Sequence, residues 1–107
     1  MTKVYGNFDQ ETLDNEFLIS KTVPALEPFI EDYARRSAEA CAAMDCRQDV
    51  SYGDHPDQVV DVFPAKGKDG GAAPVFIFIH GGYWRMLSQK ESSFMAPNMV
   101  ENGIAVV

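Results

Sequence analysis

Residues 74–84 of this 107-residue chain, Pro-Val-Phe-Ile-Phe-Ile-His-Gly-Gly-Tyr-Trp, decide its fold. The run Val75–Ile79 is apolar without alternation, which predicts a central parallel strand covered on both faces. The two glycines that follow permit a sharp turn, positive φ and close approach to a ligand. Ligands of open α/β sheets bind at the carboxyl ends of the strands, where this turn falls. We therefore expect its N–H groups to face an oxygen that becomes negative during a reaction.

A tight turn without any chemistry is the simpler interpretation of two glycines. The residues around the pair, His80 before it and Tyr83-Trp84 after it, favour the chemical interpretation. The buried strand that runs into His80-Gly81-Gly82 resembles the oxyanion-hole signature of esterase-like and lipase-like α/β-hydrolases, and Tyr83-Trp84 extends the motif to five residues. In this full form they resemble the kynurenine formamidase (arylformamidase) branch of that superfamily.

Other stretches resemble the same branch, from about Leu13 to the last residue. One is Ser88–Phe94 (Ser-Gln-Lys-Glu-Ser-Ser-Phe), which follows the glycine turn. The others match the N-terminal segment, the first two strands and the strand after the motif: 13–17, 50–53, 61–64 and 103–107. The resemblance implies an α/β fold, specifically the N-terminal part of an α/β-hydrolase.

The resemblance also implies an activity, the hydrolysis of an aryl formamide such as N-formylkynurenine to formate and the arylamine in tryptophan catabolism. A serine activated by histidine and a carboxylate attacks the formyl carbonyl. The backbone N–H groups of Gly82 and Tyr83 then hold the oxyanion, while His80 and Gly81 support the loop. Tyr83 and Trp84 face the aromatic substrate, with core packing of Trp84 as the alternative. No cofactor or metal is implied.

The nucleophile, acid and base of such an enzyme are not found in this chain. A Gly-x-Ser-x-Gly elbow is absent around every serine: Ser20, Ser37, Ser51, Ser88, Ser92 and Ser93. We therefore expect the N-terminal portion of a truncated hydrolase, with an incomplete sheet and no activity of its own. Three alternatives stay open: a small complete domain that uses the same turn, a carboxylesterase or amidase of the same fold, and a non-catalytic interaction fragment. The exact substrate among formamides and small esters is not specified by these residues.

The chain reads as one α/β unit over residues 1–107. Residues 1–23 are expected to be an extended, irregular N-terminal segment that packs across a larger body, and 24–107 a helix plus the start of the sheet. Prolines at 24 and 28 introduce the helix. A hairpin over 49–64 turns at 53–57, where His55 is expected to be exposed and inert. A second helix is expected from about Ser92 to Asn102, closed by Gly103, before a strand over 104–107.

Composition limits the partners. The net charge of −7 argues against nucleic acid and anionic membranes, because both would repel the chain. No stretch approaches the ~20 apolar residues of a membrane span, and the first 20 residues contain no secretory signal. Cys41 and Cys46 predict no disulfide framework and a cytoplasmic location, and their spacing matches no zinc pattern. The expected partner is a small aromatic formamide or ester, with homo-oligomerisation left open.

Overall fold

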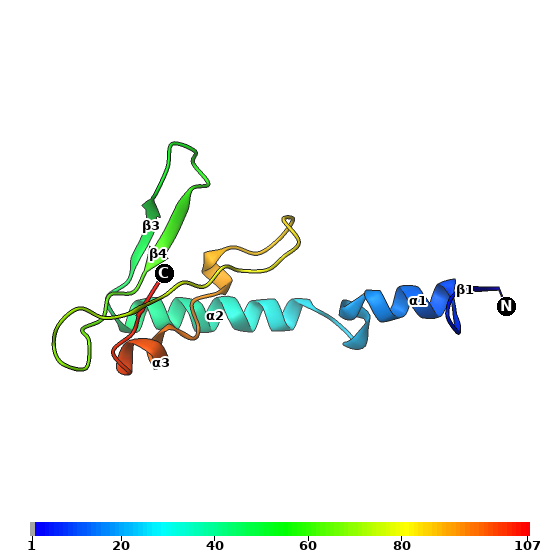
Figure 1. The fold of residues 1–107 in the computed structure, drawn as a ribbon, viewed down its shortest axis with the longest axis horizontal. Helices are drawn as coiled ribbons and strands as arrows, with labels where there is room; N and C mark the ends of the chain where they lie inside the picture. The colour runs from blue at the N-terminus through cyan, green and yellow to red at the C-terminus, as the bar shows by residue number, and fades with distance from the viewer. Residues whose placement is uncertain (1) are drawn as a thin grey trace.

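The computed structural model describes residues 2–107 as a mixed α/β chain with short sheets (Figure 1). A hairpin and a helix form the N-terminal arm, a long helix spans the middle, and the remaining strands and short helices gather around the end of that helix. The elements are β1 (Lys3–Tyr5), β2 (Phe8–Asp9), α1 (Gln10–Phe17), η1 (Ile19–Thr22), α2 (Glu27–Ala43), β3 (Arg47–Ser51), β4 (Val59–Val62), β5 (Val75–Phe76), η2 (Gln89–Glu91), α3 (Ala96–Glu101) and β6 (Ala105–Val106).

The N-terminal arm extends away from the rest of the molecule. The Cα radius of gyration is 18.9 Å, whereas a compact domain of this length has about 13 Å. The irregular course expected for residues 1–23 is wrong in one respect, since α1 forms there. Asp9 caps that helix by accepting the Thr12 N–H at 2.8 Å, which also lowers the pKa of the Asp9 carboxyl. No residue of α1 is buried, so the arm contributes nothing to the core.

Two strand pairs join at one point of contact. β3 and β4 form the expected antiparallel hairpin, and β5 pairs with β6 in parallel, with Val75 opposite Ala105. Phe63, just after β4, exchanges two hydrogen bonds with Val106 of β6, at 2.8 and 3.0 Å. The lateral order is therefore β3–β4–β6–β5. A further bond from the Phe78 N–H to the Val107 carbonyl, 2.8 Å, continues the parallel ladder beyond β5.

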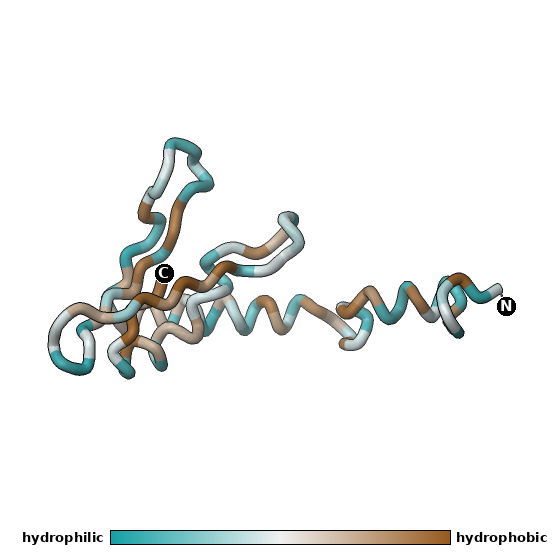
Figure 2. The backbone as a smooth tube through the Cα atoms, viewed as in Figure 1, coloured by the Kyte–Doolittle hydropathy of each residue, from teal (hydrophilic) through white to brown (hydrophobic). Residues whose placement is uncertain are grey.

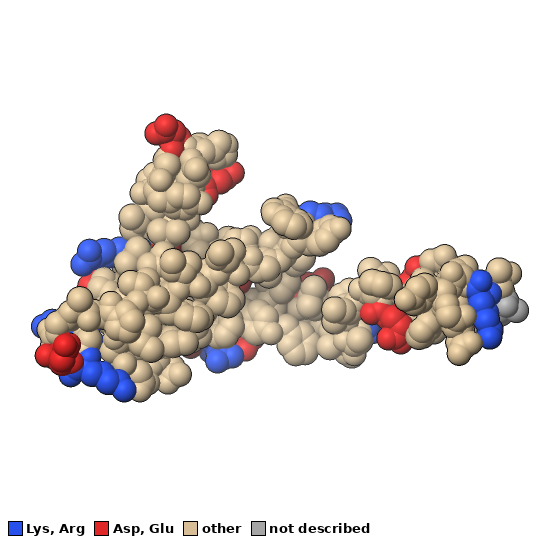
Figure 3. Space-filling view, viewed as in Figure 1, with Lys and Arg blue, Asp and Glu red and all other residues tan. Residues whose placement is uncertain are grey.

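The expectation that the run Val75–Ile79 is buried on both faces is wrong for this chain. Only Val75 and Phe76 are assigned as strand, and Ile77 and Ile79 are 67% and 85% exposed. The side chains of Val75, Ile77 and Ile79 share one face, which is left largely uncovered among the described residues, and β5 is paired on the β6 side alone. Figure 2 shows this hydrophobic segment crossing the outside of the molecule, and Figure 3 shows few charges on the same face.

Helix α2 carries the small core on its C-terminal half. The helix begins where Pro28 occupies its first turn, as the sequence predicted. The buried centre consists of Phe63, Ala96 and Val106, against which the end of α2 packs. Tyr33 stacks on Phe94 with ring centroids 5.3 Å apart, which ties the middle of α2 to the segment before α3.

The second helix starts later than predicted. α3 begins at Ala96, not at Ser92, because Pro97 is tolerated only in a first helical turn. Gly103, with φ +77°, follows the helix as expected. The residues before α3 instead form η2, whose first turn is closed by reciprocal hydrogen bonds between Ser88 and Glu91.

The two cysteines are bonded to each other, which the sequence interpretation did not anticipate. Cys41, in the last turns of α2, and Cys46, just before β3, form a disulfide with their Cα atoms 5.2 Å apart. Two cysteines are too few for a disulfide framework, but they can still form one local bond. Helix α2 and the turn after it bring these two residues together.

Candidate functional site

The glycine turn is built around Gly82. Its φ of +126° belongs to the region that favours glycine, and a Cβ at this position would overlap the carbonyl oxygen of Met86. The Gly82 carbonyl accepts the N–H groups of Arg85 and Met86, at 3.0 and 3.2 Å. At Gly81, by contrast, a Cβ would meet open space. The second glycine is therefore the one that the turn requires.

Both central residues of this turn carry large side chains in the left-handed region. Tyr83 has φ +54° and Trp84 has φ +57°, values that non-glycine residues rarely adopt. A backbone held in this way stores strain, and such strain concentrates at functional sites. The two hydrogen bonds to Gly82 that close the turn offset part of the free-energy cost of this strain.

The backbone N–H groups of the turn are free to bind a ligand. Among residues 2–107, the N–H groups of Gly81, Gly82, Tyr83 and Trp84 donate to no acceptor. Free N–H groups on a glycine turn that follows a strand are what an oxyanion site needs. The structure therefore leaves available the two donors, Gly82 and Tyr83, to which the sequence analysis assigned this role.

His80 contacts the turn directly. Its Nδ1 lies 2.8 Å from the carbonyl oxygen of Gly81, and because a carbonyl only accepts, Nδ1 is the protonated nitrogen in this contact. The ring thus braces the carbonyl side of the turn, and its Nε2 is left for another partner. This geometry is compatible with the supporting role predicted for His80.

The aromatic pair is open to solvent. Trp84 is 98% exposed and Tyr83 is 81% exposed, with their rings edge to face at a centroid distance of 5.8 Å. Core packing of Trp84, the alternative considered from sequence, is not observed in this chain. An exposed aromatic pair beside free N–H groups can contact a planar ligand.

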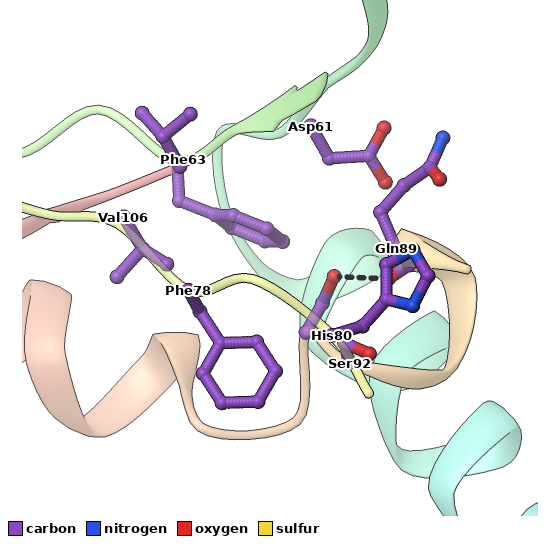
Figure 4. A pocket seen from close by; sticks show the side chains of 9 residues that line it. Asp61, Phe63, Phe78, His80, Gln89, Ser92 and Val106 are labelled. Atoms are coloured by element: carbon purple, nitrogen blue, oxygen red, sulfur yellow. Dashed lines mark hydrogen bonds between the residues drawn. The ribbon is translucent and has the colours of Figure 1, made fainter. Parts of the chain in front are cut away.

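A small cavity lies beneath His80, between the strands and η2 (Figure 4). Its volume is about 40 Å³, enough for water but too small for an aromatic substrate. Asp61, His80 and Ser92 all line it, which raises the question of a catalytic triad. The hydrogen bonds exclude one in this conformation, because Ser92 Oγ donates to the Ser88 carbonyl at 2.9 Å and Asp61 pairs with Lys90.

The pairing of Asp61 is the feature that sequence reasoning missed. Asp61 lies on β4 and is buried, only 6% exposed. Lys90 of η2 approaches both carboxylate oxygens, at 3.2 and 3.3 Å, and Asp49 at 3.0 Å. Partial burial lowers the pKa of Lys90, but the hydrogen bonds and charges of Asp49 and Asp61 outweigh it and raise that pKa above its ordinary value. An acidic residue within an apolar strand is the signal that could have suggested a buried cation partner.

A larger groove of about 320 Å³ runs beside the same strand end. Apolar side chains dominate its lining, among them Ile77 and Ile79. Its polar members are Asp57, His80 and Gln89. Its volume is that of a small-molecule site. His80 thus touches both the small cavity and this groove.

His55 and the possible metal ligands are the remaining candidate groups in the described part of the chain. His55 lies in the hairpin turn with a side chain 67% exposed, and its Nδ1 accepts the Asp57 N–H at 3.1 Å. No three His, Cys, Asp or Glu side chains among residues 2–107 are placed to hold a metal ion. None of the helices in that range has the length and apolar character needed to cross a bilayer.

Comparison with known sequences identifies relatives of this chain. The kynurenine formamidase of Danio rerio is 39% identical over 59 residues, and that of Salmo salar is 40% identical over 58. These matches cover 55% and 54% of this chain. Over about half of its length, this chain is homologous to kynurenine formamidases. The Drosophila melanogaster kynurenine formamidase matches over 49 residues at 39% identity, covering 46% of this chain and 16% of its own length.

The kynurenine formamidases are much longer than the region they share with this chain. The matches cover 20% of the Danio rerio protein and 19% of the Salmo salar protein, so the matched region spans about a fifth of these relatives. No family model matches the chain. The resemblance to this group that the sequence motifs predicted is confirmed by these matches.

A solved structure supports the α/β assignment. The structure of a proposed thioesterase from Silicibacter sp. TM1040 superimposes with a TM-score of 0.72, covering 88% of this chain and 36% of that one. The sequence identity is 22%, so the likeness concerns the fold alone. Two observations therefore agree on a mixed α/β architecture: the elements of this chain and this neighbour.

Proposed function

We propose that this chain supplies the oxyanion loop of an α/β-hydrolase that hydrolyses an aryl formamide such as N-formylkynurenine. The observation that carries the proposal is the pair of free N–H groups on Gly82 and Tyr83, in a chain homologous to kynurenine formamidases. The strand order β3–β4–β6–β5, with β4 antiparallel to β6, is compatible with the start of a hydrolase sheet. Cytoplasm is the proposed compartment.

In the proposed reaction, a serine outside these 107 residues attacks the formyl carbon. The carbonyl oxygen gains negative charge as the tetrahedral intermediate forms, and the N–H groups of Gly82 and Tyr83 donate to it. His80 holds the turn through the Gly81 carbonyl. The amine leaves, water attacks the formyl-enzyme, and formate is released. Tyr83 and Trp84 contact the aromatic ring of the substrate.

A grafted enzyme tests this proposal. Residues 24–107 of this chain replace the corresponding segment of the Danio rerio kynurenine formamidase, and this hybrid is called the grafted enzyme below. We expect it to hydrolyse N-formylkynurenine, and to prefer this formamide over a short-chain aryl ester. A folded grafted enzyme without activity on either substrate contradicts the proposal. A clear preference for the ester would instead favour a carboxylesterase of the same fold.

A further inference from the structure

We propose that Cys41 and Cys46 form a thiol–disulfide exchange site that reacts with low-molecular-weight thiols of the glutathione class. This inference does not depend on the proposed hydrolase activity. It rests on the disulfide between these two cysteines, which links the end of α2 to the segment just before β3. The pair is used neither by the glycine turn nor by the ion pair of Asp61.

The backbone builds this site locally. α2 ends at Ala43, and Met44 adopts an extended conformation that reverses the chain toward β3. Cys46 is thereby returned to the side of the helix that carries Cys41, with a Cα separation of 5.2 Å, well inside the range that a disulfide spans. When α2 is formed to its end at Ala43, it holds the two residues at this separation.

The bond lies at the edge of the core, not within it. Both cysteines are half-buried and pack against the cluster of Phe63, Ala96 and Val106. Cys41 also lines a cavity of about 150 Å³, together with Ser37 of α2 and Lys90 of η2. A disulfide with this placement is reachable by a small thiolate, while a change in its state alters the packing of α2 on the sheet.

The chemistry balances with glutathione as the co-reactant. In reduction, a glutathione thiolate attacks one protein sulfur, the protein S–S bond breaks, and a mixed disulfide forms. A second glutathione resolves the mixed disulfide, leaving two protein thiols and one glutathione disulfide. Two electrons pass to the protein sulfurs, and the two protons come from the two glutathione thiols. Oxidation is the reverse of these steps.

The test equilibrates the grafted enzyme, whose segment 24–107 carries Cys41 and Cys46, in buffers with different ratios of reduced to oxidised glutathione, and follows these two cysteines. Free thiols are then alkylated and the redox forms counted by mass spectrometry. We expect a reversible transition between dithiol and disulfide, with an equilibrium constant about tenfold or more larger in native buffer than in 6 M guanidinium chloride. Equal constants in the two solvents would show that the fold does not build the pair. A bond that stays intact at 10 mM reduced glutathione would show a fixed structural disulfide, which also overturns the proposal.

A matched pair of variants links the result to α2. Ala42 is exposed and lies between the two cysteines. Ala42→Pro removes a helical N–H and disrupts the last turn, so the native-buffer constant should fall toward the denatured value. Ala42→Ser keeps the turn and should leave the constant within about twofold of the parent. If both variants behave alike, the helix end does not build the site.

Discussion

Lys90 Nζ lies 3.2 Å from Oδ1 of Asp61, a carboxylate whose side chain is only 5% exposed. This contact joins η2 to β4, two segments 29 positions apart in sequence. Both segments border the cavity beneath His80, so the ion pair holds η2 against β4 beside that residue. Asp61 also accepts the Asp49 N–H at 2.9 Å, which holds the left-handed Asp49 in the β3 bulge.

Loss of the lysine should destabilise the grafted enzyme. Lys90→Met keeps the aliphatic stem but leaves Asp61 buried without its cation, at a cost of about 1–2 kcal/mol. The figure is below that of a fully buried pair because Lys90 is 40% exposed. The measurement is the midpoint of denaturant unfolding, with Lys66→Met as the control for losing an exposed lysine. Equal effects of the two substitutions would mean that the pair does not stabilise the fold.

The same pair predicts a pH dependence. The pKa of Lys90 is raised in the folded state, so its stabilising contribution is complete below the unfolded-state pKa of about 10.4 and is lost as the pH rises through the folded value. The stability difference between the parent and Lys90→Met should therefore be full at pH 7 and shrink above about pH 10.5. Paired unfolding curves at pH 7 and pH 11 measure it. A stability difference that grows with pH would contradict the stabilising role of the charged Lys90.

The two glycines of the turn should respond differently to alanine. Gly82→Ala forces a Cβ against the Met86 carbonyl at a φ of +126°, so the turn must move. Gly81→Ala places its Cβ in open space. In the grafted enzyme, kcat should fall at least tenfold more for Gly82→Ala than for Gly81→Ala. Similar losses for both variants would show that the observed turn geometry is not the one that matters for turnover.

The exposed run after β5 predicts how the 107-residue chain behaves alone. Ile79 is 85% exposed, and the segment offers an apolar strand edge to other molecules. We expect the isolated chain to aggregate or to bind a hydrophobic dye as a loosely packed state, and to show no formamidase activity. Ile79→Asp should reduce aggregation of the isolated chain.

Ile79→Asp should have the opposite effect on the grafted enzyme. There we expect the segment around Ile79 to be covered, so Ile79→Asp should lower the unfolding midpoint strongly. Light scattering and thermal denaturation give the two readouts. A sharp cooperative melt of a monomeric 107-residue chain, or tolerance of Ile79→Asp in the grafted enzyme, would contradict this account of the strand.

Local signals explain which parts of the fold could be predicted. Pro28 predicted the start of α2, the residues on both sides of 53–57 predicted the hairpin, and Gly82 predicted the turn. Each of these signals determines the conformation of the residues next to it in sequence. The partners of Asp61 and Cys41 could not be predicted in this way. Lys90 reaches Asp61 only after η2 packs under the sheet, and Cys46 reaches Cys41 only once α2 ends where it does.

The exposure of Ile79 shows a second feature that could not be predicted from the sequence. An apolar run predicts that a strand needs cover, but it does not say that the described residues provide it. The free N–H of Tyr83 likewise depended on a turn in which two bulky residues adopt positive φ, a conformation that sequence preferences argue against. In both places the sequence predicted a role for the segment, and its conformation came from the structure.

The backbone N–H of Tyr83 is the atom on which the central claim depends. A proline at this position would remove the N–H but cannot adopt the φ of +54°, so it would also distort the turn. Replacing the residue 83 amide by an ester, with the corresponding hydroxy acid, removes the donor while keeping the side chain and the backbone course. Tyr83→Phe is the complementary change, since it removes the phenol and keeps the N–H.

The decisive measurement is kcat for N-formylkynurenine hydrolysis by the grafted enzyme with the ester at position 83. Loss of one oxyanion donor should lower kcat by about 10²–10³, with KM nearly unchanged, because the bond strengthens only as the oxyanion forms. Tyr83→Phe, and an ester at Trp84, should each lower kcat by less than about threefold. A near-normal kcat for the position 83 ester in a folded enzyme, or loss of turnover in Tyr83→Phe alone, would contradict the account.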